Sequence, residues 1–98
     1  MNDELEKGDI LYYITKEKFV IFEVEKVEET FVHIDRYIRV SVIDRITSTK
    51  YEGMTFPANI KLMDYYCTGY GVFTTHENVA VNFFENQNFI DFSWLFNR

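Results

Sequence analysis

The chain of 98 residues is 47% hydrophobic and 18% aromatic, enough apolar area for one domain over residues 1–98 whose core needs neither disulfides nor a metal ion. Its formal net charge of −6 disfavours nonspecific binding to nucleic acid or anionic membranes, because both are negatively charged themselves. A single cysteine, an acidic start without signal-peptide features, and the lack of an apolar run of about 20 residues together predict a cytoplasmic protein, in a bacterium or in an infected cell.

The first two predicted strands form a hairpin. A strand over 10–14 is followed by a polar turn at 15–18 and by a second strand over 19–28. In the second strand apolar residues alternate with glutamates, which is the period-2 pattern of a half-buried strand. The solvent-facing side is therefore expected to be acidic. The glutamates on it and at its end are Glu23, Glu25, Glu28 and Glu29.

The middle of the chain predicts further strands. Residues 28–30 are expected to make a tight connection to a third strand over 31–42, in which apolar residues again alternate with polar ones. The apolar register is interrupted at Arg36, which indicates a bend or a bulge. A further strand or pair of strands is expected within 45–56, with Glu52–Gly53 as the candidate turn.

The next segment allows two structures. Residues 57–67 either open a short helix or form a loop followed by a strand. A short strand is expected at 70–73, and Thr74 and Glu77 have the spacing of a capping box, in which each side chain binds the backbone N–H of the other residue. The helix predicted from this signal covers about 75–86. Its residues expected to face the barrel are Val79, Ala80, Phe83 and Phe84.

The residues after this helix are strongly aromatic. Apolar side chains at even positions indicate a final strand, or else the start of a further helical turn. These side chains are too apolar to remain in water, so they either pack on the barrel or join a second copy of the chain in a homodimer. The dimer contact is predicted through Phe89, Phe92, Trp94 and Phe96.

Together these elements predict a mainly β (α+β) fold, a small SH3-like β-barrel of five to six antiparallel strands with one short C-terminal helix. The Gly-Asp-x-x-Tyr-Tyr entry at 8–13, the acidic hairpin and the step Val72-Phe73-Thr74-Thr75-x-Glu77 resemble small phage and prophage accessory proteins built on an SH3-like barrel. The resemblance covers about the first 35 residues and residues 70–85. In those proteins the last element typically reads as a Phe-x-Thr-x-Glu-Glu-Ala helix. Here Glu77-Asn78 replaces the Glu-Glu pair, and Ala80 lies later in the sequence than the usual alanine. The resemblance implies a fold and a phage setting, but it carries over no functional residue.

Candidates for catalysis are few. Cys67 and His76 are a conceivable nucleophile and base, but His76 lies in the predicted capping segment and no Gly-rich oxyanion loop accompanies Cys67. One cysteine and two histidines, His33 and His76, do not supply the ligands of a zinc site. Phosphate-binding loops, dinucleotide fingerprints and nucleophile elbows are missing from the sequence. We therefore expect no enzyme, no cofactor and no metal.

One stretch combines cationic and aromatic side chains, as proteins do that stack bases beside a cationic groove. It supports a single-stranded nucleic-acid-binding barrel as an alternative function. Its residues are Arg36, Tyr37, Arg39, Arg45, Lys50 and Tyr51. The competing interpretation is that the arginines form cross-strand ion pairs with Glu23 and Glu25.

The sequence favours a non-enzymatic, acidic protein-interaction module. Its glutamate-rich face, bordered by aromatic side chains, is expected to dock on a basic surface of a host protein. In a phage setting, such a module would inhibit or modulate a host nucleic-acid-handling protein. The predicted partner-binding residues are Glu23, Glu25, Glu28, Glu29, Tyr12 and Tyr37. A self-assembling structural protein is the third class of function considered.

Overall fold

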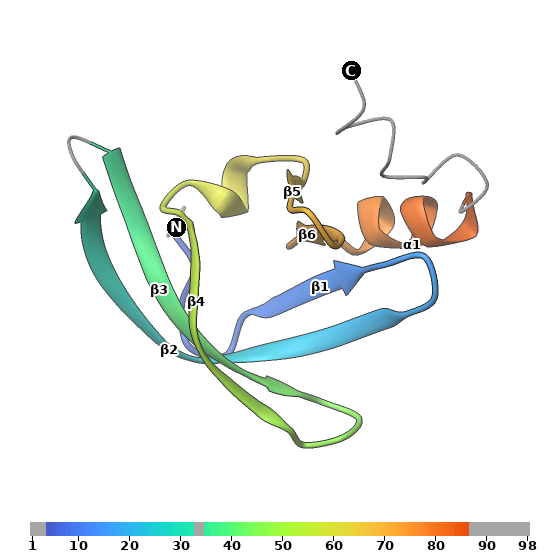
Figure 1. Ribbon diagram of the computed structural model, residues 1–98, viewed down its shortest axis with the longest axis horizontal. Helices are drawn as coiled ribbons and strands as arrows, with labels where there is room; N and C mark the ends of the chain where they lie inside the picture. The colour runs from blue at the N-terminus through green and yellow to red at the C-terminus, as the bar shows by residue number, and fades with distance from the viewer. Residues whose placement is uncertain (1–3, 33–34, 87–98) are drawn as a thin grey trace.

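The computed structural model describes residues 4–32 and 35–86, and it confirms the predicted fold class. Within these ranges six antiparallel strands curl into a half-barrel that carries one α-helix (Figure 1). The strands are β1 (Ile10–Ile14), β2 (Phe19–Val32), β3 (Asp35–Asp44), β4 (Lys50–Pro57), β5 (Tyr66–Cys67) and β6 (Val72–Thr74). Their order in the sheet is β4-β3-β2-β1-β6-β5, so β4 and β5 are the two edges of an open sheet.

The predicted β1–β2 hairpin is confirmed. Ile14 pairs with Phe19 across the turn at 15–18, and the Thr15 hydroxyl accepts hydrogen bonds from the backbone N–H groups of Glu17 and Lys18. Within the turn these N–H groups have no partner on a neighbouring strand, so the threonine hydroxyl accepts their hydrogen bonds instead. It thereby holds the two strands in register.

The tight connection predicted at 28–30 is wrong. Strand β2 continues through these residues to Val32, and Glu28 pairs with Arg39 of β3. The physical reason is that this polar run contains no Gly, Pro, Asn or Asp, the residues that favour turns, and a glutamate is well placed on a solvated strand face opposite an arginine.

The irregularities of the long strands also differ from the prediction. Arg36 pairs regularly with β2, and the bulge lies at Glu25, between Val24 and Lys26. A second irregularity sets two residues of β4, Glu52 and Gly53, opposite one residue of β3. Gly53 has a φ of 79°, a conformation that glycine adopts without steric cost. Glu52–Gly53 is therefore a bulge in one strand and not the expected turn.

The actual turn between β3 and β4 is built on Asp44. Its carboxylate accepts hydrogen bonds from the backbone N–H groups of Ile46 and Thr47, at 2.8 and 3.1 Å. These bonds lower the pKa of Asp44 because they stabilise the charged carboxylate. The aspartate thus satisfies the backbone of a turn that contains neither glycine nor proline.

Of the two structures considered for 57–67, the loop followed by a strand is correct. The loop contains a single 3-10 turn, η1 (Ile60–Leu62), and ends at β5. Ile60 is fully buried, and the Lys61 Nζ lies 3.0 Å from the Asp9 carboxylate. The ion pair ties the loop to the start of β1, and Ile60 anchors the loop in the hydrophobic core.

The predicted helix is α1 (Glu77–Glu85), but its cap differs from the prediction. His76 is the N-cap residue, while Thr74 is the last residue of β6. The buried Thr74 hydroxyl donates to the Asp64 carbonyl at 2.7 Å and accepts from the His76 N–H at 3.1 Å. The capping box is absent here because this hydroxyl connects the end of β6 to the loop before β5.

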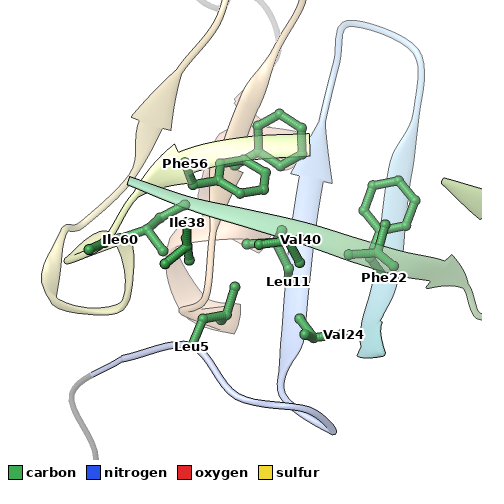
Figure 2. Close-up of a cluster of buried hydrophobic side chains, with 11 residues drawn as sticks. Leu5, Leu11, Phe22, Val24, Ile38, Val40, Phe56 and Ile60 are labelled. Atoms are coloured by element: carbon green, nitrogen blue, oxygen red, sulfur yellow. The ribbon is translucent and has the colours of Figure 1, made fainter. Parts of the chain in front are cut away.

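The sheet has a hydrophobic core on each side of β1. On the inner face, residues from β1 to β4 and from the following loop converge, among them Leu11, Phe22 and Phe56 (Figure 2). On the outer face, α1 packs against β1 and β6 and buries Ile14 and Ala80 completely (Figure 1). The prediction that Val79, Ala80, Phe83 and Phe84 face the barrel is confirmed by their partial or full burial.

The strand predicted within 89–96 and the dimer contact through Phe89, Phe92, Trp94 and Phe96 lie outside the described residues. Among the described elements, no helix has both the length and the apolar character needed to cross a membrane.

Candidate binding groove

A groove of about 1100 Å³ opens on the inner face of the half-barrel. Its walls are the β1–β2 hairpin, strand β4, the turn between β3 and β4, and the loop between β5 and β6. Most of the larger side chains that line it are aromatic. These are Tyr13, Phe19, Phe22, Tyr51, Phe56, Tyr70 and Phe73.

The floor of the groove is the surface of the inner core. The rings of Tyr13 and Phe73 stack with centroids 4.4 Å apart, and Phe56 meets Phe73 edge-on at 4.8 Å. Phe22, Phe56 and Phe73 also belong to the buried core, so their positions are fixed by packing on all other sides. A floor of this kind is preformed, which reduces the ordering cost of binding.

The rim of the groove exposes large apolar side chains. Ile46 is 77% exposed, Tyr70 is 84% exposed and Tyr51 is 45% exposed. These three are half of the large hydrophobic residues that the described part of the chain exposes, and all three line this groove. Clustered exposed apolar side chains beside a hollow are typical of a binding surface, whereas isolated ones need no explanation.

Charged groups on the rim are mainly acidic. Asp44 and Glu52 line the groove together with a single cation, Lys18. Asp44 is charged at neutral pH, as an aspartate with an ordinary pKa already is, and the hydrogen bonds of the turn lower its pKa further. Glu52 makes no direct ion pair with any residue that the structure describes. The rim therefore favours a basic group on whatever occupies the groove.

The four glutamates predicted to bind a partner lie on β2, away from the groove lining. Each has a cationic neighbour, and they do not share one face. Glu23 and Glu28 point to the outer face, whereas Glu29 is opposite the buried Ile38 and belongs to the inner side. The pairs are Glu23–Arg45 at 3.9 Å, Glu25–Lys50 at 3.2 Å, Glu28–Lys26 at 2.8 Å and Glu29–Arg36 with 2.6 Å between Oε1 and Nε.

The two tyrosines predicted beside these glutamates lie at opposite ends of the outer face. Tyr12 pairs with Thr74 of β6, and Tyr37 pairs with Pro57 at the far end of β4. The Tyr12 hydroxyl lies near the Glu77 carboxylate at the start of α1. Burial, followed by the charge of Glu77, raises the pKa of Tyr12. The structure does not bring the six predicted residues together.

The cations considered for nucleic-acid binding are also dispersed. Arg36 contacts both Glu29 and Glu4, and Arg45 contacts Glu23, so the expected cross-strand pairing is confirmed for Arg45. Lys50 pairs with Glu25, and Arg39 stands opposite Glu28 on the outer face. Tyr51 lines the groove, while Tyr37 points to the outer side. Within the described residues, these cations therefore do not form a continuous row beside stacked aromatic rings.

The remaining chemical candidates are separated or unreactive. Cys67 lies on β5, and partial burial raises the pKa of its thiol, opposite to the shift that activates a nucleophile. His76 is the N-cap of α1, and no hydrogen bond joins it to Cys67. In the two described ranges, no group of three or more potential metal ligands was found.

Sequence reasoning missed the groove because its residues come from segments that are far apart in the chain. The one local signal was Tyr70, an aromatic residue between two glycines in a turn, where a ring has no neighbour on its own strand. No family model matches the chain, and the searches of curated proteins and of solved structures gave no match. The geometry of the groove is therefore the basis for a functional argument.

Proposed function

We propose that this protein is a non-enzymatic protein-interaction module that binds an apolar segment of a basic partner protein in the groove. The observation that carries the proposal is the exposure of Ile46, Tyr51 and Tyr70 around a floor of packed rings. Tyrosine and other large side chains beside a preformed hollow are the usual anchors of protein interfaces.

The charges around the groove favour a protein partner over a nucleic acid. Two carboxylates and one lysine line the groove, and the whole chain carries a net charge of −6. A phosphate backbone is repelled by such a surface, whereas lysine or arginine beside an apolar anchor complements Asp44 and Glu52. The glutamates of β2 then contribute to long-range attraction of a basic partner, not to the contact itself.

Recognition is expected to occur through side chains, not through an added strand. The free edge of the sheet beside the groove is β4, which contains the bulge at Gly53 and ends with Pro57. Bulges and proline interrupt the row of backbone donors that an incoming strand needs, and they are common protections of an edge. The partner segment is therefore read by the rings of the floor and rim.

The test is selection of binders from a random peptide library on the immobilised full-length chain. We expect enriched peptides that combine bulky apolar residues with lysine or arginine. Replacing Tyr70→Ser should weaken binding of such a peptide by about tenfold or more, because a few aromatic side chains that become buried against the partner contribute most of the energy of an interface. Isothermal titration calorimetry measures the change.

The matched control is Leu62→Ser, because Leu62 is also exposed, at 63%, but does not line the groove. The control should bind the same peptide as the wild type does. Equal affinity of wild type, Tyr70→Ser and Leu62→Ser for every enriched peptide would contradict the assignment of the groove as the binding site.

A further inference from the structure

We infer that one end of the groove is an arginine subsite, in which the guanidinium group of a partner segment stacks on the ring of Tyr51 and pairs with the carboxylate of Asp44. The inference rests on the proposed function and deepens it, because it names the anchoring group of the basic partner. It is supported by the position of Asp44 beside two groove rings, by the fixed orientation of its carboxylate, and by the exposed apolar wall at Ile46.

The carboxylate and the rings lie on the same face of the sheet. Asp44 of β3 is directly opposite Phe22 of β2, and Tyr51 of β4 is opposite Val42, two residues before Asp44. Opposite and diagonal residues of antiparallel strands share a face and lie within reach of long side chains. The rings of Phe22 and Tyr51 meet edge-on, with centroids 5.6 Å apart. All three side chains line the groove and form a corner of two rings and one anionic group.

The carboxylate of Asp44 is held in place before a ligand arrives. Its Oδ1 atom accepts hydrogen bonds from the backbone N–H groups of Ile46 and Thr47, and the Asp44 N–H donates to the Thr49 carbonyl at 2.8 Å. Both of these backbone donors use Oδ1, so Oδ2 keeps the capacity to accept a hydrogen bond from a guanidinium. An acceptor that is already oriented reduces the ordering cost of binding.

The surroundings of this carboxylate suit a guanidinium better than an ammonium group. The guanidinium of arginine is planar and weakly hydrated, and it stacks on aromatic faces, whereas the ammonium of lysine is a compact, strongly hydrated charge. Tyr51 is 45% exposed, so its ring is accessible to a cation. Ile46 is 77% exposed beside Asp44 and offers an apolar wall to the methylene groups of an arginine side chain.

One cation of the protein lies near the same carboxylate. Lys18 also lines the groove, but no ion pair joins it to Asp44 within the part of the chain that the structure describes. The pKa of Asp44 is lowered chiefly by the hydrogen bonds from Ile46 and Thr47, and the charge of Lys18 contributes less, in the same direction. Lys18 therefore weakens the attraction of Asp44 for an arriving cation without occupying the carboxylate.

The probe for this subsite is N-acetyl-arginine N-methylamide, which carries the guanidinium and has no charged termini. It is titrated into the isotope-labelled full-length chain, and binding is followed by NMR. We expect saturable shifts of the amide signals of Tyr51 and of Ile46 and Thr47, because the last two donate to Asp44. The citrulline analogue has nearly the same shape but no charge and should leave these signals unchanged. No shift with the arginine compound, or equal shifts with both compounds, overturns the inference.

Two variants test the two contacts separately. Asp44→Asn keeps an oxygen that accepts the hydrogen bonds of the turn but removes the charge, and it should weaken binding of the arginine compound about fivefold or more. Tyr51→Leu keeps an apolar side chain but removes the ring, and it should weaken binding about threefold or more. The matched control Glu28→Gln removes one negative charge outside the groove and should change affinity by less than about twofold. Unchanged binding by either groove variant, or equal losses for Asp44→Asn and Glu28→Gln, overturns the inference.

A third variant predicts a gain that misfolding does not produce. Lys18→Met removes the neighbouring charge and should tighten binding of the arginine compound about twofold or more. Its control is Lys16→Met, in the same turn but outside the groove lining, which should have a smaller effect. Unchanged or weaker binding by Lys18→Met overturns the inference.

The arginine compound tests the subsite without any selected peptide. Tyr70-dependent peptide binding combined with failure of the arginine compound would leave the proposed function standing alone. Binding of the arginine compound as expected, combined with a library that yields no Tyr70-dependent peptide, would support the subsite and contradict the proposed function.

Discussion

Gly71 shows how a single residue can decide whether two parts of this fold fit together. A Cβ atom at this position would lie 2.6 Å from the Ile14 carbonyl oxygen and 2.8 Å from Cε1 of Tyr13. Both neighbours belong to β1, the strand beside β6, and the Tyr13 ring is held by stacking on Phe73. The close approach of the backbone at the start of β6 therefore requires glycine.

We predict that Gly71→Ala lowers the free energy of unfolding by about 1–3 kcal/mol, because the contacting carbonyl cannot move without disturbing β1. Urea denaturation followed by circular dichroism measures the loss. Gly69→Ala, in the same turn but exposed, is the control and should change stability by no more than about 0.5 kcal/mol. If both substitutions lower the free energy of unfolding by the same amount, the close contact at Gly71 does not affect stability.

The two glycines also show what the sequence alone can predict at this scale. The sequence predicted a short strand over 70–73 that includes Gly71, and the observed strand β6 covers Val72–Thr74, so it begins just after this glycine. Which glycine approaches β1 depends on the pairing of Ile14 with Val72, a contact between residues far apart in the chain. No local pattern in the sequence contains that information.

Among the elements, α1 depends on the sheet for its stability. It has nine residues, too few for a helix to persist alone in water, and no side chain caps its first turn. Its anchors are Ala80, which is fully buried on the outer face, and Phe84, which contacts Phe19. Packing, not intrinsic propensity, therefore holds the helix.

We predict that Phe84→Ala lowers the free energy of unfolding by about 2 kcal/mol, less than for a fully buried ring because Phe84 is only half-buried. Val81→Ala is a control on the same helix whose side chain is 37% exposed, and it should cost about 0.5 kcal/mol or less. Thermal and urea denaturation measure both. If Val81→Ala lowers the free energy of unfolding more than Phe84→Ala does, the side of α1 that packs on the sheet is not the one described here by Ala80 and Phe84.

The elements that sequence patterns predicted well are those with a clear period. Apolar alternation placed the start of β2 correctly, and the spacing of Ala80, Phe83 and Phe84 indicated the buried side of α1. The predictions failed where polar residues are compatible with two different local structures. Residues 28–30 continue a strand because arginine stands opposite, and Thr74 ends a strand because its hydroxyl finds the Asp64 carbonyl.

At the scale of the whole molecule, the predicted strands and helix indicated the fold class but not the site. The chain is 18% aromatic, and several of its rings line the groove. Its lining extends from Tyr13 to Phe73, so it exists only after the sheet has curled and left β4 and β5 unpaired with each other. Whether a barrel closes is decided by tertiary packing, which periodicity does not report.

The charge of the molecule is expected to act on the rate of partner encounter, separately from the groove. Reversing Glu23, Glu25, Glu28 and Glu29 to lysine changes the net charge from −6 to +2, because each reversal adds two positive charges. These glutamates do not line the groove. Their reversal should lower the association rate constant for a basic peptide selected on the groove by about tenfold at low salt, with little change in its dissociation rate.

Surface plasmon resonance at low and high salt separates the two rates. Tyr70→Ser should show the opposite behaviour, with faster dissociation and nearly unchanged association, because an anchor in the contact determines how long the complex lasts. The control for the reversed variant is the exchange Glu25→Lys/Lys50→Glu, which inverts one ion pair and preserves the net charge. If the reversed variant instead loses affinity through faster dissociation at all salt concentrations, the glutamates of β2 are part of the contact, and the interface extends from the groove onto β2.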